Sequence, residues 1–225
     1  MHFAFENRDS GKFSLTQISD GVTDVISFPR EFHVDLTLID VDPLKALTAA
    51  LLLFEVNDGS GLINAPSASL QLDRTLRRQR GEYSPHLVVD PLVESTHDNH
   101  TQLLLANHRD SAFPVQPDGK GRNVLIQCRD SSRWAGKLFS LDRVEFASNY
   151  MMFVDQTGLN ATTALVATGL LLAGDWKSSM LTVENVGALS REECADLIEI
   201  CAAIGVRTRI VEKSAMEGML KYGEA

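Results

Sequence analysis

The sequence predicts a mixed α/β (α+β) fold in which helices pack on a sheet of parallel and antiparallel strands. Three observations predict it. Short runs of alternating apolar and polar residues indicate strands, and apolar residues at a period of 3.6 behind good capping residues indicate helices. The stretch from about residue 160 to 213 then alternates helix, strand, helix and strand. We therefore expect an antiparallel middle and a parallel βαβ unit at the C-terminal end.

The first well-defined strand is expected over residues 32–39, where apolar and polar side chains alternate. Asp42 and Pro43 follow it. Asp is a good N-cap, and Pro suits the first helical position because no backbone donor is needed there. The sequence therefore predicts a helix over 43–56 that is apolar on most sides.

A second helix is expected to start at Ser67 or Ser69 and to end near Arg80. Gly81 beyond it suits a helix C-terminus. Residues 86–89 fit a short strand. In the region 96–110, a run of three leucines fits a buried strand and a buried helix equally well.

The middle of the chain contains several short strand-like runs at the spacing typical of antiparallel β structure. These runs are residues 123–128, 137–139, 144–147 and 150–154.

The C-terminal region has the clearest signals. Asn160 fits the N-cap of an apolar helix, and a strand is expected over 180–184. Ser190 and Glu193 form a capping-box pattern, in which each side chain satisfies a backbone donor of the other residue. A strand at 207–211 follows, so this stretch predicts a parallel βαβ unit.

For domain organisation, we expect residues 1–21 to be a flexible or edge arm and residues 22–225 to be one globular domain. The alternative is two sub-lobes, 22–112 and 123–225, joined by the Pro- and Gly-rich segment 113–122.

Composition excludes some classes of partner. The 225 residues carry a formal net charge of −9. Nonspecific nucleic-acid binding and binding to anionic membranes both need a basic surface, so neither is expected. The start of the chain lacks the basic and apolar pattern of a secretory signal, and the three cysteines do not suggest a disulfide framework. We therefore expect a soluble protein of the cytoplasm.

A divalent metal site is one candidate. Three of the six histidines lie within twelve residues, with two aspartates beside them. Imidazole and carboxylate groups together suit zinc or another first-row ion. The candidate ligands are His97, Asp98, His100, His108 and Asp110.

An anion site is the second candidate. Arginines bind phosphate and carboxylate groups through bidentate contacts, and the start of a helix offers backbone N–H groups. The candidate residues are Arg74, Arg77, Arg78 and Arg80 in the second helix, and Thr157, Gly158 and Asn160 before the apolar helix. Cations in the last turns of a helix also complement the helix dipole, and this gives the arginines a purely structural alternative.

The segment Asp40-Val41-Asp42-Pro43-Leu44 resembles the nucleophile motif of haloacid-dehalogenase-type phosphotransferases. The resemblance covers five residues and implies that Asp40 is the nucleophile and Asp42 the acid. The chain has Pro43 where that family usually has Gly. The structural alternative is that Asp42 caps the helix.

No motif specifies a chemistry, so the sequence does not decide whether the protein is an enzyme. Our first hypothesis is a non-catalytic binding or assembly protein that contacts partner chains or forms a homo-oligomer. The second is a small metal-dependent hydrolase that uses residues 97–110. The third is a binder of a phosphorylated or carboxylate metabolite.

Overall fold

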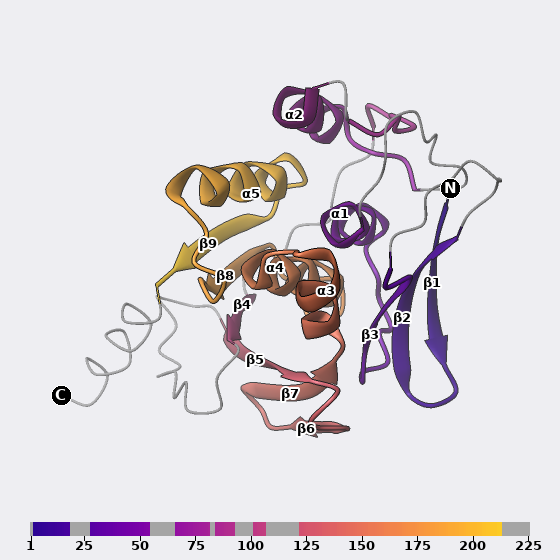
Figure 1. Ribbon diagram of the computed structural model, residues 1–225, viewed down its shortest axis with the longest axis vertical. Coiled ribbons are helices and arrows are strands. Elements are labelled where there is room, and N and C mark those ends of the chain that lie inside the picture. Colours follow the sequence, from indigo (N-terminus) through magenta and orange to yellow (C-terminus); the bar gives the residue numbers. More distant parts are fainter. Residues whose placement is uncertain are drawn as a thin grey trace.

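The chain begins with an antiparallel ribbon. In the computed structural model (Figure 1), the residues described are 2–18, 28–54, 66–81, 84–92, 101–106 and 122–212. The ribbon consists of β1 (His2–Arg8), β2 (Lys12–Ile18) and β3 (Glu31–Val34). Alternation places Phe3, Phe13 and Leu15 in the core, and leaves Glu6 and Arg8 exposed.

The remaining strands are β4 (Thr101–Ala106), β5 (Arg122–Asp130), β6 (Lys137–Phe139), β7 (Arg143–Ser148), β8 (Met180–Glu184) and β9 (Arg207–Val211). Within the described residues, all nine strands form one sheet in the order β1-β2-β3-β7-β5-β4-β8-β9, and β6 pairs with β7. The strands from β7 to β9 in this order are parallel to one another. The sheet is therefore antiparallel at its β1 end and parallel at its β9 end.

The helices are α1 (Pro43–Leu53), α2 (Leu70–Arg80), α3 (Tyr150–Thr157), α4 (Ala161–Leu172) and α5 (Arg191–Ala203). Four of them begin at a side chain that accepts backbone N–H bonds: Asp42, Ser69, Asn160 and Ser190. At α5 the capping box is complete, because Glu193 also accepts the Ser190 backbone N–H. None of the helices in the described parts of the chain is long and apolar enough to cross a membrane.

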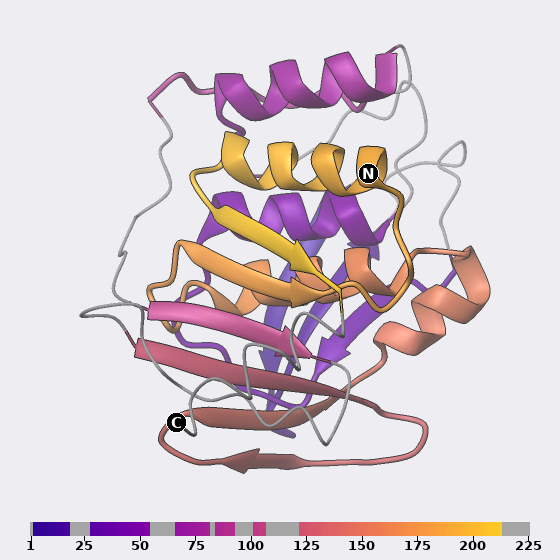
Figure 2. The same ribbon diagram turned by 90° about the vertical axis from the view of Figure 1, so that its left-hand side faces the viewer.

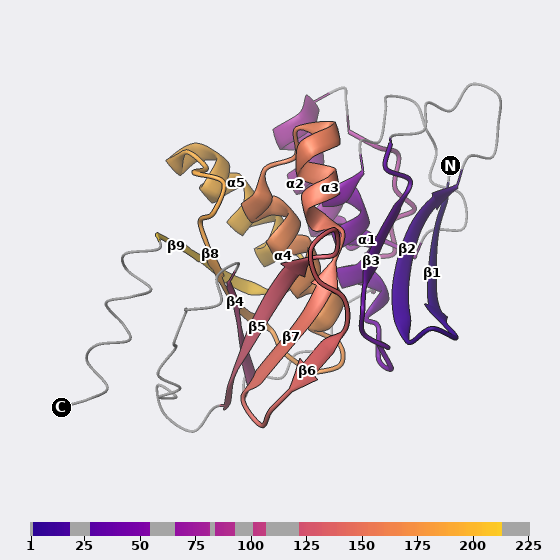
Figure 3. The ribbon, with the colours of Figure 1, turned by 60° about the horizontal axis from the view of Figure 1, so that its bottom comes forward.

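Helix α4 is the centre of the core. Figure 1 shows the sheet curving around α4 and α3, with α1 beside α4 and α2 beyond α5. Figure 3 shows the helices together on one side of β4, β5 and β7, with the antiparallel ribbon on the far side of α1. Nearly every residue of α4 is buried, and Gly169 lets it approach Leu105 on β4 and Leu181 on β8 closely.

The antiparallel ribbon meets the parallel strands at a seam between β3 and β7. The ladder across this seam has a single pair, Val34 with Ser148. The side chain of Asn149 extends it, because its Oδ1 accepts the His33 backbone N–H at 2.8 Å and its Nδ2 donates to the Glu31 carbonyl at 2.7 Å. Asn149 thus takes the part of a strand residue, giving one acceptor and one donor as a peptide group does.

A second joint connects the end of α4 with the segment that follows β3. Asp175 Oδ1 accepts the backbone N–H groups of Ile39 and Asp40 at 2.8 and 2.6 Å. Gly174 lies so close to Asp40 that a Cβ there would sit 1.8 Å from the Asp40 carbonyl oxygen. The buried Lys45 adds a bond from its Nζ to the Ser178 carbonyl at 3.3 Å.

The predicted mixed sheet with packed helices is confirmed, and so is the parallel βαβ unit, which is β8-α5-β9. In the middle of the chain, β6 and β7 are antiparallel, whereas β5 and β7 are parallel. The strand predicted over 150–154 is wrong, because these residues begin α3 and bury Tyr150 and Phe153 on one helical face.

The strand predicted over 32–39 is shorter than expected, since β3 ends at Val34. Beyond β3, the side chain of Asn7 replaces a strand neighbour. It donates to the Leu38 carbonyl and accepts the Leu38 backbone N–H. Residues 86–89 contribute an isolated bridge between Ala68 and Val89 instead of a strand. The segment 113–122 lies outside the described residues except for Arg122, which begins β5, so the division into domains stays a prediction.

Candidate functional site

The arginines of the predicted anion site lie on α2, and two of them are bound to acidic side chains. Arg77 Nε donates to Asp73 Oδ2 one helical turn away, at 2.9 Å. Arg78 forms an ion pair with Glu199 on α5. Arg74 is exposed. Both pairs are largely exposed on the arginine side, so each stabilises the fold only modestly.

Arg80 points from the end of α2 toward α1. Its Nη2 donates to the Leu51 carbonyl at 3.0 Å, and burial lowers the pKa of its guanidinium from the ordinary value. The carbonyl is in the last turn of α1, where helix C-termini attract cations. Arg80 and Arg78 therefore help hold α2 onto its neighbours α1 and α5.

The other half of the predicted anion site is the turn between α3 and α4. Gly158 ends α3 in the left-handed conformation, with a φ of 73°, and Thr157 Oγ1 accepts the Leu159 N–H at 3.2 Å. Asn160 caps α4, and its Oδ1 accepts the Thr162 N–H at 2.9 Å. The start of α4 thus satisfies a backbone donor with its own capping side chain.

The turn after β8 closes over the start of α4. Asn160 Nδ2 donates to the Gly187 carbonyl at 2.8 Å, and the Gly187 N–H donates to Thr162 Oγ1 at 3.0 Å. A Cβ on Gly187 would sit 2.1 Å from Asn160 Oδ1. Gly187 is therefore needed in this turn because a side chain there would collide with Asn160.

No hydrogen bond or ion pair between described residues joins α2 to the 157–160 turn, so the two halves of the predicted anion site are not linked. The metal candidates His97, Asp98, His100, His108 and Asp110 all lie outside the described residues. Within the described part of the chain, no group of three His, Cys, Asp or Glu side chains could hold a metal ion. Both sites stay predictions.

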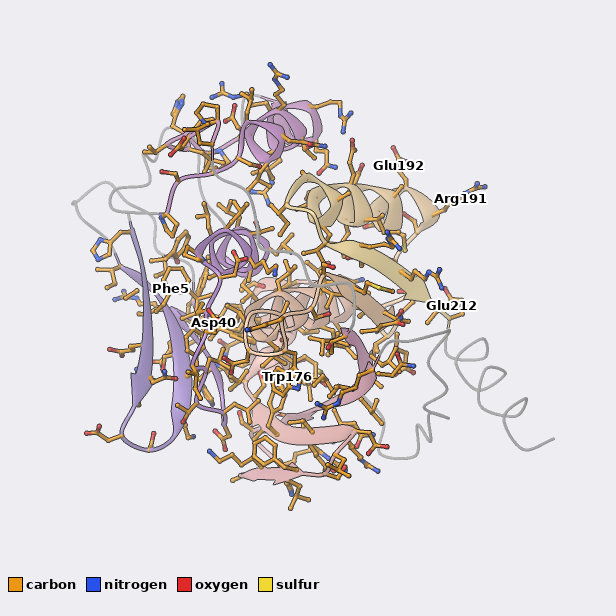
Figure 4. The ribbon with its side chains drawn as sticks, turned by 180° about the vertical axis from the view of Figure 1, so that it is seen from behind. Phe5, Asp40, Trp176, Arg191, Glu192 and Glu212 are labelled. Atoms are coloured by element: carbon orange, nitrogen blue, oxygen red, sulfur yellow. The ribbon has the colours of Figure 1, made fainter. Side chains whose placement is uncertain are left out.

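The Asp40–Asp42 step has a structural role in the fold. Asp42 Oδ1 accepts the N–H groups of Leu44 and Lys45 at 3.0 and 3.1 Å, which is the N-cap geometry of the structural alternative. The Asp40 N–H is bound to Asp175, and Figure 4 shows Asp40 near Trp176 at the end of α4. These contacts give the Asp42 carboxylate a capping role, whereas Asp40 is held through its backbone and its side chain is exposed.

The carboxyl ends of the parallel strands are where open α/β sheets usually bind ligands. At the end of β8, Asn185 Oδ1 accepts the Leu189 N–H at 3.0 Å, and its Nδ2 donates to Glu212 Oε1 at 2.8 Å. Figure 4 shows Glu212 at the end of β9, with Arg191 and Glu192 pointing outward from the first turn of α5. Asn185 and Glu212 thus bind each other, and Asn185 fixes the turn before α5.

Cys128 on β5 is also structural. Its side chain is buried, and burial raises the pKa of the thiol far above its usual range. The neighbouring Arg129 pairs with Glu145 and lies over the Trp134 ring, 5.9 Å from its centre. A buried thiol of this kind is a poor nucleophile.

The feature that stands out on the surface is an apolar strand edge. Leu138 and Phe139 on β6 are 61% and 60% exposed, and Leu141 just after it is 88% exposed. We call these residues, with Lys137, the β6 edge. Figure 2 shows β6 at the border of the sheet, with β7 on one side and no described strand on the other.

The strand at 137–139 was predicted, but its position at a sheet border was not. The signal present in the sequence is the run Lys137-Leu138-Phe139-Ser140-Leu141, which has three large apolar residues but only one pair at strand spacing, Phe139 and Leu141. A strand with only one sheet neighbour leaves a row of backbone groups able to pair with another chain.

Comparisons with known proteins identify no relative: no protein-family model, no curated protein and no solved structure matches the chain.

Proposed function

We propose that the protein is a non-catalytic binding or assembly protein of the cytoplasm that associates with another polypeptide through the β6 edge. The observation that carries the proposal is the exposure of Leu138, Phe139 and Leu141 beside a strand edge that no other described strand covers. Exposed apolar groups on an open edge suit β-augmentation, in which main-chain hydrogen bonds give affinity and side chains give specificity.

The polar groups of the described residues support the same proposal. Asn185 at the carboxyl edge of the sheet, and three of the four arginines on α2, bind other groups of the protein itself. All three cysteines are free thiols, which suits a reducing compartment.

The test is site-specific photo-cross-linking in the cells that produce the protein. A photoreactive amino acid at position 141 should give covalent adducts with polypeptide, and Leu138→Asp should abolish them because a charge would be placed in the contact. The matched control puts the photoreactive group at Ile39, which is 91% exposed but outside the β6 edge. Absence of adducts, or adducts that survive Leu138→Asp, would contradict the proposal.

A further inference from the structure

We infer that the partner of the β6 edge is a second copy of this chain, paired antiparallel about a two-fold axis through Leu138. The inference rests on the proposed function and names the partner of that same surface. It depends on which backbone groups of β6 face away from β7, on how two such edges match, and on where their side chains fall.

The backbone groups that face away from β7 belong to Lys137 and Phe139. The Ala147 N–H donates to the Gly136 carbonyl, and the Ser140 N–H donates to the Arg143 carbonyl. In an antiparallel ladder, residues alternate between bonding to the neighbouring strand and pointing away from it. The backbone N–H and C=O groups of Gly136, Leu138 and Ser140 therefore face β7. Those of Lys137 and Phe139 face away from it.

A two-fold axis through Leu138 gives each of these outward-facing backbone groups a hydrogen-bonding partner on the second copy. It sets Lys137 opposite Phe139 of the second copy and Phe139 opposite Lys137 of the second copy. Each is then a hydrogen-bonded antiparallel pair, in which both residues exchange N–H···O bonds. A longer partner strand would leave some of its own edge groups unpaired, whereas β6, which has only three residues, has the matching length.

The side chains fit the same register. Leu138 meets its own copy across the axis, so two apolar groups come together. Lys137 lies opposite Phe139 of the other copy. Its Nζ donates to the Gly11 carbonyl of its own chain at 3.5 Å, and it would leave this long, exposed bond to make a cation–π contact with the Phe139 ring. The two lysines are diagonal to each other and not opposite, so the register avoids setting like charges face to face. The interface is isologous, because the same residues are used on both sides.

The expected dimer is weak. Three partly exposed apolar side chains on each copy would bury roughly a few hundred Å² of surface. A stable standard interface buries about 1,200 Å² or more. The net charge of −9 on each copy also opposes association, although salt screens this over about 8 Å. We therefore expect a weak, reversible dimer that forms only as the protein concentration is raised.

Sedimentation velocity of the purified full chain, measured over a wide concentration range, tests the inference. The wild type should shift from monomer to dimer as its concentration rises. Phe139→Lys should weaken the dimer about tenfold or more, because it places a lysine opposite Lys137 of the other copy. The double variant Lys137→Glu/Phe139→Lys should restore the dimer, since each pair then has opposite charges.

Ile39→Lys is the matched control, an exposed apolar residue outside the β6 edge changed to the same cation, and it should leave the dimer intact. A dimer insensitive to Phe139→Lys, or not restored by the double variant, overturns the inference. A wild-type chain that stays monomeric also overturns it. If cross-linking from position 141 still depends on Leu138 in that case, the partner is another protein and the proposed function stands. If cross-linking fails as well, both fail.

Discussion

The antiparallel ribbon and the parallel part of the sheet are held together in different ways. In the parallel part, backbone ladders run over several residues of every neighbouring pair, and α4 covers them. Between the ribbon and the parallel part, one ladder pair is supplemented by individual side chains and by a close glycine contact. The regions thus share few backbone pairs, and apolar side chains of the ribbon pack into the core that α4 fills, as Phe32 does against Phe153.

The largest expected effect is at the second joint. Gly174→Ala should destabilise the protein by about 3 kcal/mol or more, because the new Cβ would meet the Asp40 carbonyl oxygen at 1.8 Å. Urea unfolding measures the change in the free energy of unfolding. Gly158→Ala is the control: its Cβ would meet nothing within 4 Å, so the only cost is placing Ala in the left-handed conformation, with a φ of 73°, at about 1–2 kcal/mol. Equal losses from the two variants would show that the joint is loose.

An intermediate effect is expected at the seam. Asn149→Ala should lower the free energy of unfolding by about 2–3 kcal/mol, because it leaves the partly buried His33 N–H and Glu31 carbonyl without their side-chain partner. Hydrogen exchange should rise in β3 and hardly at all in β8. Asn185→Ala, which removes an amide from the parallel part, should instead loosen the turn before α5. If both variants loosened the same amides, the two regions would not be separable.

The smallest effect concerns pH and the outer face of the ribbon. The pKa of His33 is lowered by burial and by the nearby Lys12, while Asp35 and Glu31 act in the opposite direction and Arg8 adds to the lowering. The unfolded chain then binds a proton more readily than the folded chain, so stability is present above about pH 6.5 and falls as the pH drops below it. Wild type should lose more stability between pH 7.5 and 5.5 than His33→Gln, as measured by urea unfolding at each pH. A larger loss of stability in the variant would show that His33 does not destabilise the folded protein at low pH.

The sequence predicted the structural features that depend on residues close together in the chain. The caps Asp42, Asn160 and Ser190 were identified because a capping side chain and its backbone donors lie within three residues of each other. The strand expected over 150–154 was wrong because aromatic and β-branched residues favour strands, whereas Tyr150 and Phe153 also fit one face of a helix. The local pattern alone could not choose between the two.

The joints and the β6 edge depend on residues far apart in the chain. Asn149 meets His33 over a separation of 116 residues, and nothing near either residue indicates the contact. The apolar residues of β6 were visible, but their exposure follows from the position of β6 at a sheet border. The anion and metal sites, by contrast, were suggested by residue types alone, and three of the four arginines of α2 contact α1, α5 and their own helix.

The seam also sets an order of events during synthesis. Because Asn149 follows His33 by 116 residues, β3 leaves the ribosome well before the residue that completes its pairing exists. At about 5–20 residues per second, the delay is roughly 6–23 seconds. During that interval the nascent ribbon has an open β3 edge, which is the period in which a chaperone or a neighbouring nascent chain could reach it.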